Sequence, residues 1–293
     1  MSTRDILSGL VAALALGLAF IAIKIGVGQA PPLLLTALRF IFAAVPAIFF
    51  VARPKAPAPL VALYGLLIGV GVFGLMFLAI AHGMAAGLAS LVIQLQAFIT
   101  VFFAWALLRE RPTAIQMSAA SLAFLGIVVI GSARLGGASL GPFLLVIAAA
   151  LCWGAANIVG KRAGRIDMFA FTIWSSLAPP LPLLALSIYL DGPRATQALV
   201  HPSWTLALCV AVLAYGATVL GFGLWSRLLA HYPASQVATF ALLIPVVGMI
   251  SGWLIFAEPL SLAEFLGALL VMAGLTFNIF GERLCVYGFR RAG

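Results

Sequence analysis

Three basic side chains stand inside otherwise apolar stretches and are the first candidates for chemistry: Lys24, Arg39 and Lys161. A cation held away from water can receive a carboxylate through charge-assisted hydrogen bonds. The three residues are therefore candidates for a gate or for binding a substrate carboxylate. The alternative is that their long side chains reach outward to a polar surface. Arg39 lies roughly 10 Å along the helix from Pro32. A further alternative for this residue is that its side chain donates hydrogen bonds to helix carbonyls.

Acidic residues are missing from the middle of the apolar stretches. The chain's seven lie in connections or near expected helix ends: Asp5, Glu110, Asp167, Asp191, Glu258, Glu264 and Glu282. The three histidines also lie near connections. Proton-driven pumps commonly use an Asp, Glu or His within the membrane as a relay. This pattern therefore favours facilitated movement of a solute down its gradient, and proton coupling through a peripheral residue stays open.

Residue clusters that hold metals or cofactors are absent from the sequence. A membrane enzyme that uses Mg²⁺ would need clustered carboxylates, and a metalloprotease would need a motif such as HExxH. The cysteines Cys152, Cys209 and Cys285 are far apart and form no CxxC pair, which predicts small apolar residues rather than a zinc site or disulfide framework. We expect no metal and no cofactor, and an integral-membrane enzyme is a remote alternative.

Polar and aromatic residues fall on common helical faces. Ser90, Gln94 and Phe98 share one face, and Trp153 and Asn157 lie one turn apart on another stretch. Polar groups avoid lipid, so these faces should surround a cavity. The predicted substrate-binding residues are Phe20, Phe73, Met76, Phe77, Ile80, Ser90, Gln94, Phe98, Trp153, Asn157, Trp174 and Trp225. Two alternatives stay open, namely aromatic rings that face lipid and amide side chains that only join helices.

The composition indicates which elements position these residues. Of 293 residues, 65% are hydrophobic and 8% are charged, with a mean hydropathy of +1.22. Ordinary globular domains are about half apolar and a quarter charged. Folded in water, this chain would expose very large apolar areas, so a lipid bilayer is its expected surrounding. The net charge of +9 is explained by basic loops, and no basic stripe or motif for nucleic acid is present.

Ten apolar stretches are long enough to cross a bilayer, which requires about 20 residues each. They lie near residues 6–28, 32–52, 59–81, 86–108, 113–132, 140–161, 168–190, 204–229, 234–257 and 261–281. The longest connection is 191–203, so there is no room for a soluble domain. The predicted fold class is all-α integral membrane, with ten transmembrane helices. The first run extends past the length of a signal peptide's apolar core and is interpreted as a span.

The loop charges predict the orientation. With the N-terminus in the cytoplasm, twelve Lys and Arg residues lie on the cytoplasmic side and two, Arg134 and Arg194, lie outside. Basic residues favour the cytoplasmic side of a membrane. We therefore expect both termini to be cytoplasmic.

The two halves of the chain resemble each other. The matched positions, at offsets of 137, 149 and 148, are Gly17 and Gly154, Lys24 and Lys161, Gly74 and Gly223, His82 and His231, Trp105 and Trp253, and Glu110 and Glu258. A first repeat, 6–132, thus corresponds to a second, 140–281. Because each has five spans, the second must enter the membrane from the opposite side. Inverted repeats typically surround a central cavity and exchange conformations during transport.

Two stretches at matched positions carry a family resemblance. The segment WGAANIVGK at 153–161 resembles the WGxxN…K opening of EamA-type domains in the drug/metabolite transporter superfamily. The first repeat keeps Gly17, Phe20 and Lys24 but has Leu16 where the pattern prefers Trp. The segments around Glu110 and Glu258 resemble the "LGE" ending of each fourth span. The resemblance covers nearly the whole chain.

The resemblance implies a ten-helix monomer in a bacterial inner (plasma) membrane, whose partners are a small-molecule substrate and the lipid bilayer. Within the family the sequence is similar to exporters of the YddG type, which are associated with aromatic amino acids and methyl viologen. The expected function is export of such compounds by alternating access. Alternative cargoes of the same fold are other amino acids, drugs, quaternary amines, nucleotide sugars and sugar phosphates. Phosphorylated cargo would require several basic groups in the cavity.

Overall fold

A computed structural model describes the backbone of residues 1–134, 140–164 and 166–291, and their side chains except at 234–235 and 282–291. In this part of the chain every regular element is helical. The first half contains α1 (Thr3–Gln29), α2 (Pro32–Ala47), α3 (Ala58–Leu66), η1 (Leu67–Gly74), α4 (Leu75–Ala81), α5 (Ala86–Val92), η2 (Ile93–Leu95), α6 (Gln96–Leu108) and α7 (Ala114–Ser132).

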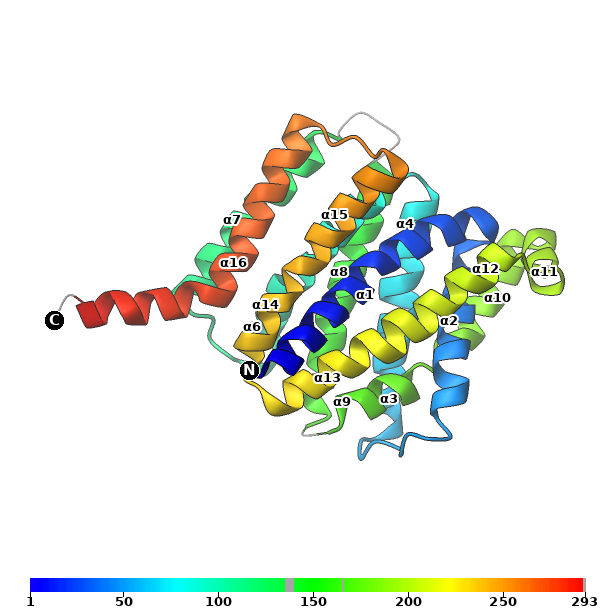
Figure 1. Cartoon of the computed structure of the whole chain (residues 1–293), viewed down its shortest axis with the longest axis horizontal. Coiled ribbons are helices and arrows are strands. Elements are labelled where there is room, and N and C mark those ends of the chain that lie inside the picture. Colours follow the sequence, from blue (N-terminus) through cyan, green and yellow to red (C-terminus); the bar gives the residue numbers. More distant parts are fainter. Residues whose placement is uncertain (135–139, 165, 292–293) are drawn as a thin grey trace.

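The second half begins at α8 and is also entirely helical in its described residues. It contains α8 (Leu140–Arg162), α9 (Met168–Ser175), α10 (Pro180–Asp191), α11 (Pro193–Val200), α12 (Trp204–Ala211), η3 (Val212–Gly221), α13 (Phe222–His231), α14 (Ala234–Ala241), α15 (Leu243–Phe256) and α16 (Leu262–Arg291). The long connection expected at 191–203 therefore includes a short helix, α11. Figure 1 shows the helices side by side in one bundle, with α7 and α16 along one side.

Nine helical stretches of the described chain are long and apolar enough to cross a membrane. They are Thr3–Gln29, Ala58–Ala81, Ala86–Leu108, Ala114–Ser132, Leu140–Arg162, Met168–Asp191, Trp204–His231, Gln236–Phe256 and Leu262–Gly281. The span expected at 32–52 is a shorter helix, α2, of 16 residues. Pro46 lies in its last turn, and Pro54 and Pro57 follow in the connection, so the helix does not continue. A tenth span thus stays a prediction.

Local signals explain where several helices begin and end. The Thr113 hydroxyl accepts from the amide of Gln116, whose side chain accepts from the amide of Thr113, so the two form a capping box at α7. The Asp167 carboxylate caps α9 in a similar way. At the ends of α6 and α15 the chain turns through left-handed residues, Arg109 (φ 58°) and Ala257 (φ 50°). These two residues are 148 positions apart, the offset found from the sequence.

Five of the apolar stretches are interrupted near their middle. The segments η1 and η3 are π-helical, with five-residue rather than four-residue backbone hydrogen bonds. One turn of 3₁₀ helix, η2, separates α5 from α6, and a break at Leu242 separates α14 from α15. The chain also breaks between α9 and α10, before Pro179 and Pro180. Interrupted helices at membrane depth occur where the backbone is buried in protein or lines a cavity.

Helix neighbours in one half have counterparts in the other. Helix α1 packs against α15 and η3, whereas α8 packs against α6 and η1. Helices α7 and α16 pack closely on each other. A methyl group at Gly126 would lie 2.6 Å from the carbonyl oxygen of Gly267, and one at Gly274 would lie 2.8 Å from that of Ala119. Only glycine allows this approach of the two backbones.

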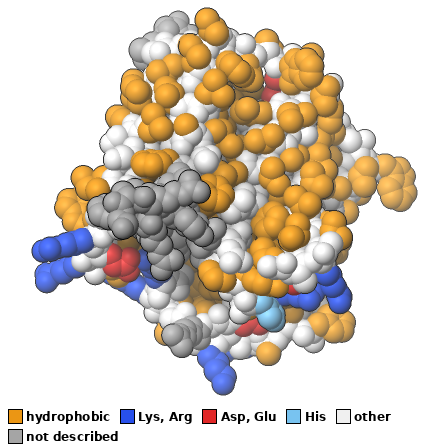
Figure 2. Space-filling model, turned by 60° about the vertical axis from the view of Figure 1, so that its left-hand side comes forward, with side chains coloured by type: hydrophobic (Ala, Val, Ile, Leu, Met, Phe, Trp, Pro, Cys, Tyr) orange, Lys and Arg blue, Asp and Glu red, His pale blue; other side chains and the backbone are white. Residues whose placement is uncertain are grey.

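The outer surface is strongly apolar. Trp204, Phe50 and Leu181 are 92%, 89% and 79% exposed. Figure 2 shows orange hydrophobic side chains over much of one face, with the blue Lys and Arg side chains gathered toward its lower end. An exposed apolar band of this extent belongs in lipid. The chain is a multi-pass membrane protein.

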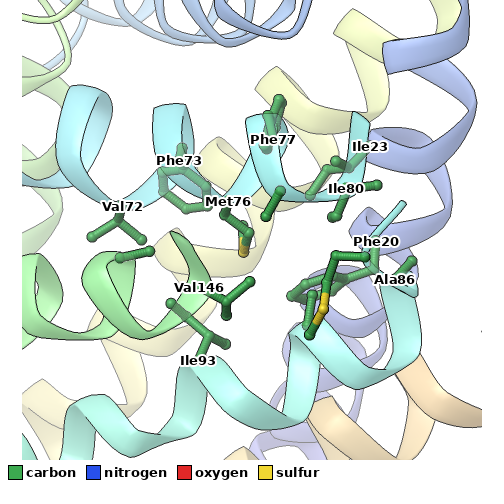
Figure 3. Packing of buried hydrophobic residues seen from close by; sticks show 14 of the residues in the cluster. Phe20, Ile23, Val72, Phe73, Met76, Phe77, Ile80, Ala86, Ile93 and Val146 are labelled. Atoms are coloured by element: carbon green, nitrogen blue, oxygen red, sulfur yellow. The ribbon is translucent and has the colours of Figure 1, made fainter. Parts of the chain in front are cut away.

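The bundle has two ends, named here after the lysine that lies at each. The Lys161 end holds the start of α1, the α6–α7 connection and the end of α8. The Lys24 end holds the end of α1, the α4–α5 connection and the end of α15. Between the ends, buried residues of α1, η1, α4, α5 and α8 form a continuous core, part of which is shown in Figure 3.

Candidate functional site

A cavity of about 300 Å³ lies among α1, η1, η2, α8, α9, η3 and α13. Its volume is at the lower end of the range typical of small-molecule sites. Eight predicted site residues line it: Phe20, Arg39, Phe73, Met76, Gln94, Trp153, Asn157 and Trp225. The structure thus brings together residues from six separate stretches of sequence around one space.

Five other predicted binding residues lie outside the lining. Phe77, Ile80 and Phe98 are 0%, 2% and 7% exposed and pack in the core. The Ser90 hydroxyl donates to the carbonyl of Gly87 in its own helix. The Trp174 indole donates to the backbone carbonyl of Val51, away from the cavity. For these five residues, the expectation of a cavity-lining position is wrong.

The positions of the residues along η1 and α4 explain part of this error. A regular helix was expected to present Phe73, Met76, Phe77 and Ile80 on one face. In Figure 3, Phe73 and Met76 lie toward Ile93, whereas Phe77 and Ile80 lie on the part of the helix nearer α1. Phe73 belongs to η1, whereas Met76, Phe77 and Ile80 all belong to the regular helix α4. Phe77 follows Met76 by one position and therefore faces about 100° away from it, and Ile80 lies one turn nearer the Lys24 end.

Several lining residues were not among the predicted ones, including Tyr64, Gln96, Thr172 and Phe222. Phe222 had a signal in the sequence, because it matches Phe73 at the offset of 149. The repeat links other lining residues at its three offsets: Met76 with Trp225 at 149, Ile93 with Ala241 and Gln96 with Ile244 at 148, and Leu16 with Trp153 and Phe20 with Asn157 at 137. The lining is thus built from matched positions that carry different side chains.

Arg39 is buried in the bundle, with 2% of its surface exposed. Its expected extension to a polar surface is wrong, because α2 is packed against α10, η1 and η3 at this level. The Nε atom donates to the Thr218 hydroxyl at 3.2 Å. The guanidinium lies 3.8 Å from the ring centre of Phe73 and 5.6 Å from that of Phe40, distances typical of cation–π contacts.

Amide side chains form a polar cluster in the wall. The Asn157 amide donates to the side-chain oxygen of Gln96 at 2.7 Å and to the Thr100 hydroxyl at 2.9 Å. Gln94 donates at 3.3 Å to the carbonyl of Ala241, beside the break between α14 and α15. Both amide side chains therefore join helices, as the alternative interpretation predicts, and both also line the cavity.

The cavity extends toward the Lys161 end. Its lining reaches Met168, the first residue of α9, and Leu229, close to the end of α13. Toward the Lys24 end, Met84 and Ile23 are 0% and 1% exposed and fill the bundle. The described side chains therefore leave the cavity closed at the Lys24 end.

Lys24 and Glu258 form an ion pair at this closed end. The Lys24 Nζ lies 3.5 Å from Glu258 Oε1, and the side chains are 29% and 12% exposed. The Glu258 carboxylate also accepts from the backbone amides of Ala86 at 2.9 Å and Gly87 at 3.2 Å, at the start of α5. Glu258 therefore ties the end of α15 to the start of α5 and to α1.

Lys161 and Glu110 form the matched pair at the other end. The Lys161 Nζ lies 2.7 Å from Glu110 Oε2, and the side chains are 47% and 53% exposed. An exposed pair of this kind contributes about 0–1 kcal/mol. Both lysines are therefore paired with a carboxylate, and the exposed Lys161 side chain also reaches the surface, as the alternative interpretation predicts.

In the described stretches, no three residues of the types His, Cys, Asp and Glu are close enough together to hold a metal ion. The chemistry available at the cavity is hydrogen bonding, aromatic contact and the charge of Arg39.

A membrane-embedded bundle with interrupted helices around an aromatic-lined cavity defines a transporter, since substrate sites of transporters commonly lie at such interruptions. The EamA-like transporter family model matches residues 3–132 and 140–280. The chain belongs to this family. It is a transporter and not an enzyme.

Similar proteins agree with this class. A "Probable amino-acid metabolite efflux pump" of Salmonella typhimurium is 42% identical over 291 residues, which is 97% of both chains. A protein of Escherichia coli with the same description has the same identity and coverage. A solved crystal structure covers 97% of this chain and 99% of its own, with a TM-score of 0.66 at 23% identity, which shows a similar fold.

Proposed function

We propose that this protein exports amino acids and related amphipathic metabolites, with a preference for aromatic ones, across a bacterial inner membrane. The observation that carries the proposal is the cavity, whose wall combines aromatic rings with amide and hydroxyl groups. Aromatic rings bind other aromatic rings in offset or edge-to-face contacts. The descriptions of the two relatives at 42% identity support amino-acid metabolites as the class.

Methyl viologen, a planar aromatic dication, is the second candidate cargo. The rings of Phe73, Trp153 and Phe222 line the cavity and offer faces to which a cation is attracted. The same aromatic wall therefore suits two kinds of planar solute, which differ in charge.

The proposed architecture is a monomer with ten spans in two inverted repeats, 6–132 and 140–281, and with both termini in the cytoplasm. Three features support it: the paired neighbours of α1 and α8, the matched π-helical segments η1 and η3, and the matched left-handed residues Arg109 and Ala257. The gathering of basic side chains at one end supports the orientation. In this orientation the cavity opens to the cytoplasm.

The two matched ion pairs support alternating access as the proposed mechanism. In the present state, Lys24 and Glu258 close the outer end with the amides of Ala86 and Gly87. In the opposite state, we expect Glu110 to bind the first amides of α14 and close the inner end with Lys161. Each lysine then acts as part of a gate, and the repeats exchange their conformations.

Facilitated export is the proposed mode. Within the described residues, the cavity lining includes no Asp, Glu or His that would serve as a proton relay. A cell that accumulates an amino-acid metabolite supplies the gradient that drives its exit.

The test is export from proteoliposomes that contain the purified protein. We expect release of phenylalanine, tyrosine and tryptophan to exceed that of glutamate and lysine. The variant Ala241→Trp should abolish export, because Ala241 lines the cavity and a large side chain would fill it. Ala207→Trp is the matched control, since Ala207 is exposed on α12 and should keep export unchanged.

Cells that overproduce the protein should also tolerate p-fluorophenylalanine better than cells that overproduce Ala241→Trp. A protein that releases none of a broad panel of amino acids and aromatic metabolites would contradict the proposal. Equal release with and without an imposed proton gradient is expected for facilitated export, and a strict requirement for the gradient would replace that part of the mechanism.

A further inference from the structure

Arg39 is the only residue with a formal charge among the described side chains that line the cavity. It also borders a small side chamber of about 30 Å³ with Tyr64, Ser176 and Thr218. With 2% of its surface exposed, the residue is removed from bulk water. An ionised group in such a place is costly unless it is paired.

The partners that the described chain provides to Arg39 are incomplete. None of its acidic side chains forms an ion pair with the guanidinium. The single hydrogen bond from Nε to Thr218 leaves the four N–H groups of Nη1 and Nη2 without a partner in the described residues. The Phe73 ring, 3.8 Å away, compensates for part of the charge. An arginine stays protonated in proteins, so loss of the charge is not an alternative.

We propose that Arg39 binds the carboxylate of the transported solute. The cavity would then select anionic and zwitterionic monocarboxylates over neutral or cationic compounds of the same shape. Thr218 engages Nε, so the Nη1 and Nη2 edge would receive the carboxylate. This inference rests on the proposed function, because it names the chemical group by which that cavity recognises its cargo.

The position of Arg39 beside aromatic rings fits such a ligand. Phe73 lies under the guanidinium, and the ring of Trp153 is 6.1 Å from that of Phe73. A carboxylate at Arg39 would thus place an adjoining aromatic side chain against aromatic walls. The described lining offers no carboxylate to a dication, and Arg39 would repel it. Under this inference methyl viologen, the second candidate cargo, binds more weakly than a carboxylate of similar size.

Ligand binding by the purified protein in detergent tests this inference independently of transport. The probes are phenylalanine, N-acetylphenylalanine, phenylalaninamide, phenethylamine and methyl viologen, and the readout is the ligand concentration that raises the melting temperature. We expect the two carboxylates to bind at least about tenfold more tightly than the other three probes, as a charge-assisted pair predicts.

Variants separate binding from a purely structural role of Arg39. Arg39→Gln should abolish the preference for phenylalanine over phenylalaninamide. Arg39→Lys keeps the charge without the two-pronged geometry and should retain part of the preference. Thr218→Val removes the hydroxyl that holds Nε and should reduce the preference without removing it. Arg134→Gln is the matched control, because Arg134 is a mostly buried cation paired with Glu264 outside the cavity.

The outcomes are distinct. A preference for carboxylates that Arg39→Gln removes and Arg134→Gln keeps supports the inference, whether or not the same solutes are transported. Equal binding of all probes by the unmodified protein, or binding of none, overturns it. A preference that survives undiminished in Arg39→Gln overturns it as well, even where export of amino acids has been demonstrated.

Discussion

The two ends of the bundle carry the same pair of residue types at matched positions, in different surroundings. At the Lys24 end, Glu258 is 12% exposed and binds two backbone amides in addition to the lysine. At the Lys161 end, Glu110 is 53% exposed. A carboxylate that accepts hydrogen bonds from amides is held far more strongly than an exposed ion pair. We therefore attribute closure of the Lys24 end to the hydrogen bonds from the α5 amides to Glu258. Among the described residues, the Lys161 end has the ion pair without such bonds and is open.

A glycine accounts for part of this difference. At Gly252, a methyl group would lie 2.5 Å from Glu258 Oε2 and 3.3 Å from the amide nitrogen of Gly87. The residue at the matched position, 148 earlier, is Ala104. The Lys24 end thus has room for the carboxylate between the helices, and the Lys161 end has a methyl group there. Two repeats with similar sequences can in this way prefer different conformations.

The largest expected effect comes from removing the charge of Glu258. Glu258→Gln weakens two charge-assisted hydrogen bonds and the ion pair, a change of about 2 kcal/mol or roughly thirtyfold in the ratio of closed to open states. The measurement is the rate at which a maleimide labels Ile80→Cys, in a background without the native cysteines. Ile80 is 2% exposed at the closed end, so its labelling reports opening.

Glu110→Gln is the matched control for this experiment. It should leave the labelling of Ile80→Cys unchanged, because the Lys161–Glu110 pair is exposed and lies at the other end. Export should fall in both variants, since the proposed cycle uses both gates. Equal increases in labelling for the two variants would remove the basis of the comparison.

Exchanging the charges separates the ion pair from the bonds to the amides. The double variant Lys24→Glu with Glu258→Lys restores the pair in reverse, but a lysine at 258 cannot accept from the amides of Ala86 and Gly87. We expect labelling of Ile80→Cys to stay elevated by about tenfold, the effect of losing one or two charge-assisted bonds.

The same exchange at Lys161 and Glu110 should leave this labelling at the level of the unmodified protein. If the exchange at Lys24 and Glu258 returned the labelling of Ile80→Cys to the level of the unmodified protein, the ion pair and not the amides would close this end. High salt should weaken the exposed Lys161–Glu110 pair more than the less exposed Lys24–Glu258 pair, because salt screens exposed charges more strongly.

Much of this comparison had its basis in the sequence. The repeat in the sequence matched the position of Lys24 to that of Lys161, and the position of Glu110 to that of Glu258. The composition and spacing also indicated a membrane bundle and eight of the residues that line the cavity. These features depend on hydrophobicity and periodicity, which act locally or along a single helix.

The remaining features depend on how the helices meet. The sequence left open whether Arg39 faces a cavity or reaches a surface, and the packing of α2 against η1 and η3 explains its burial. Phe77 and Ile80 were expected in the cavity, and their positions in α4 place them in the core. The bonds of Glu258 to Ala86 and Gly87 join residues more than 170 positions apart. Contacts of this kind do not follow from spacing in one helix.

The smallest expected effect tests the contribution of Gly252. Gly252→Ala should raise the labelling of Ile80→Cys about threefold to tenfold, because the Glu258 side chain can move but then loses its bonds to the amides. Ala104→Gly should do the reverse at the other end and slow the labelling of Ala241→Cys in the cavity. Glycine also weakens a helix by about 1 kcal/mol, so Ala106→Gly, at an exposed position of α6, is the control for that loss. If Ala104→Gly and Ala106→Gly behave alike, the difference between the two ends does not depend on space for the carboxylate.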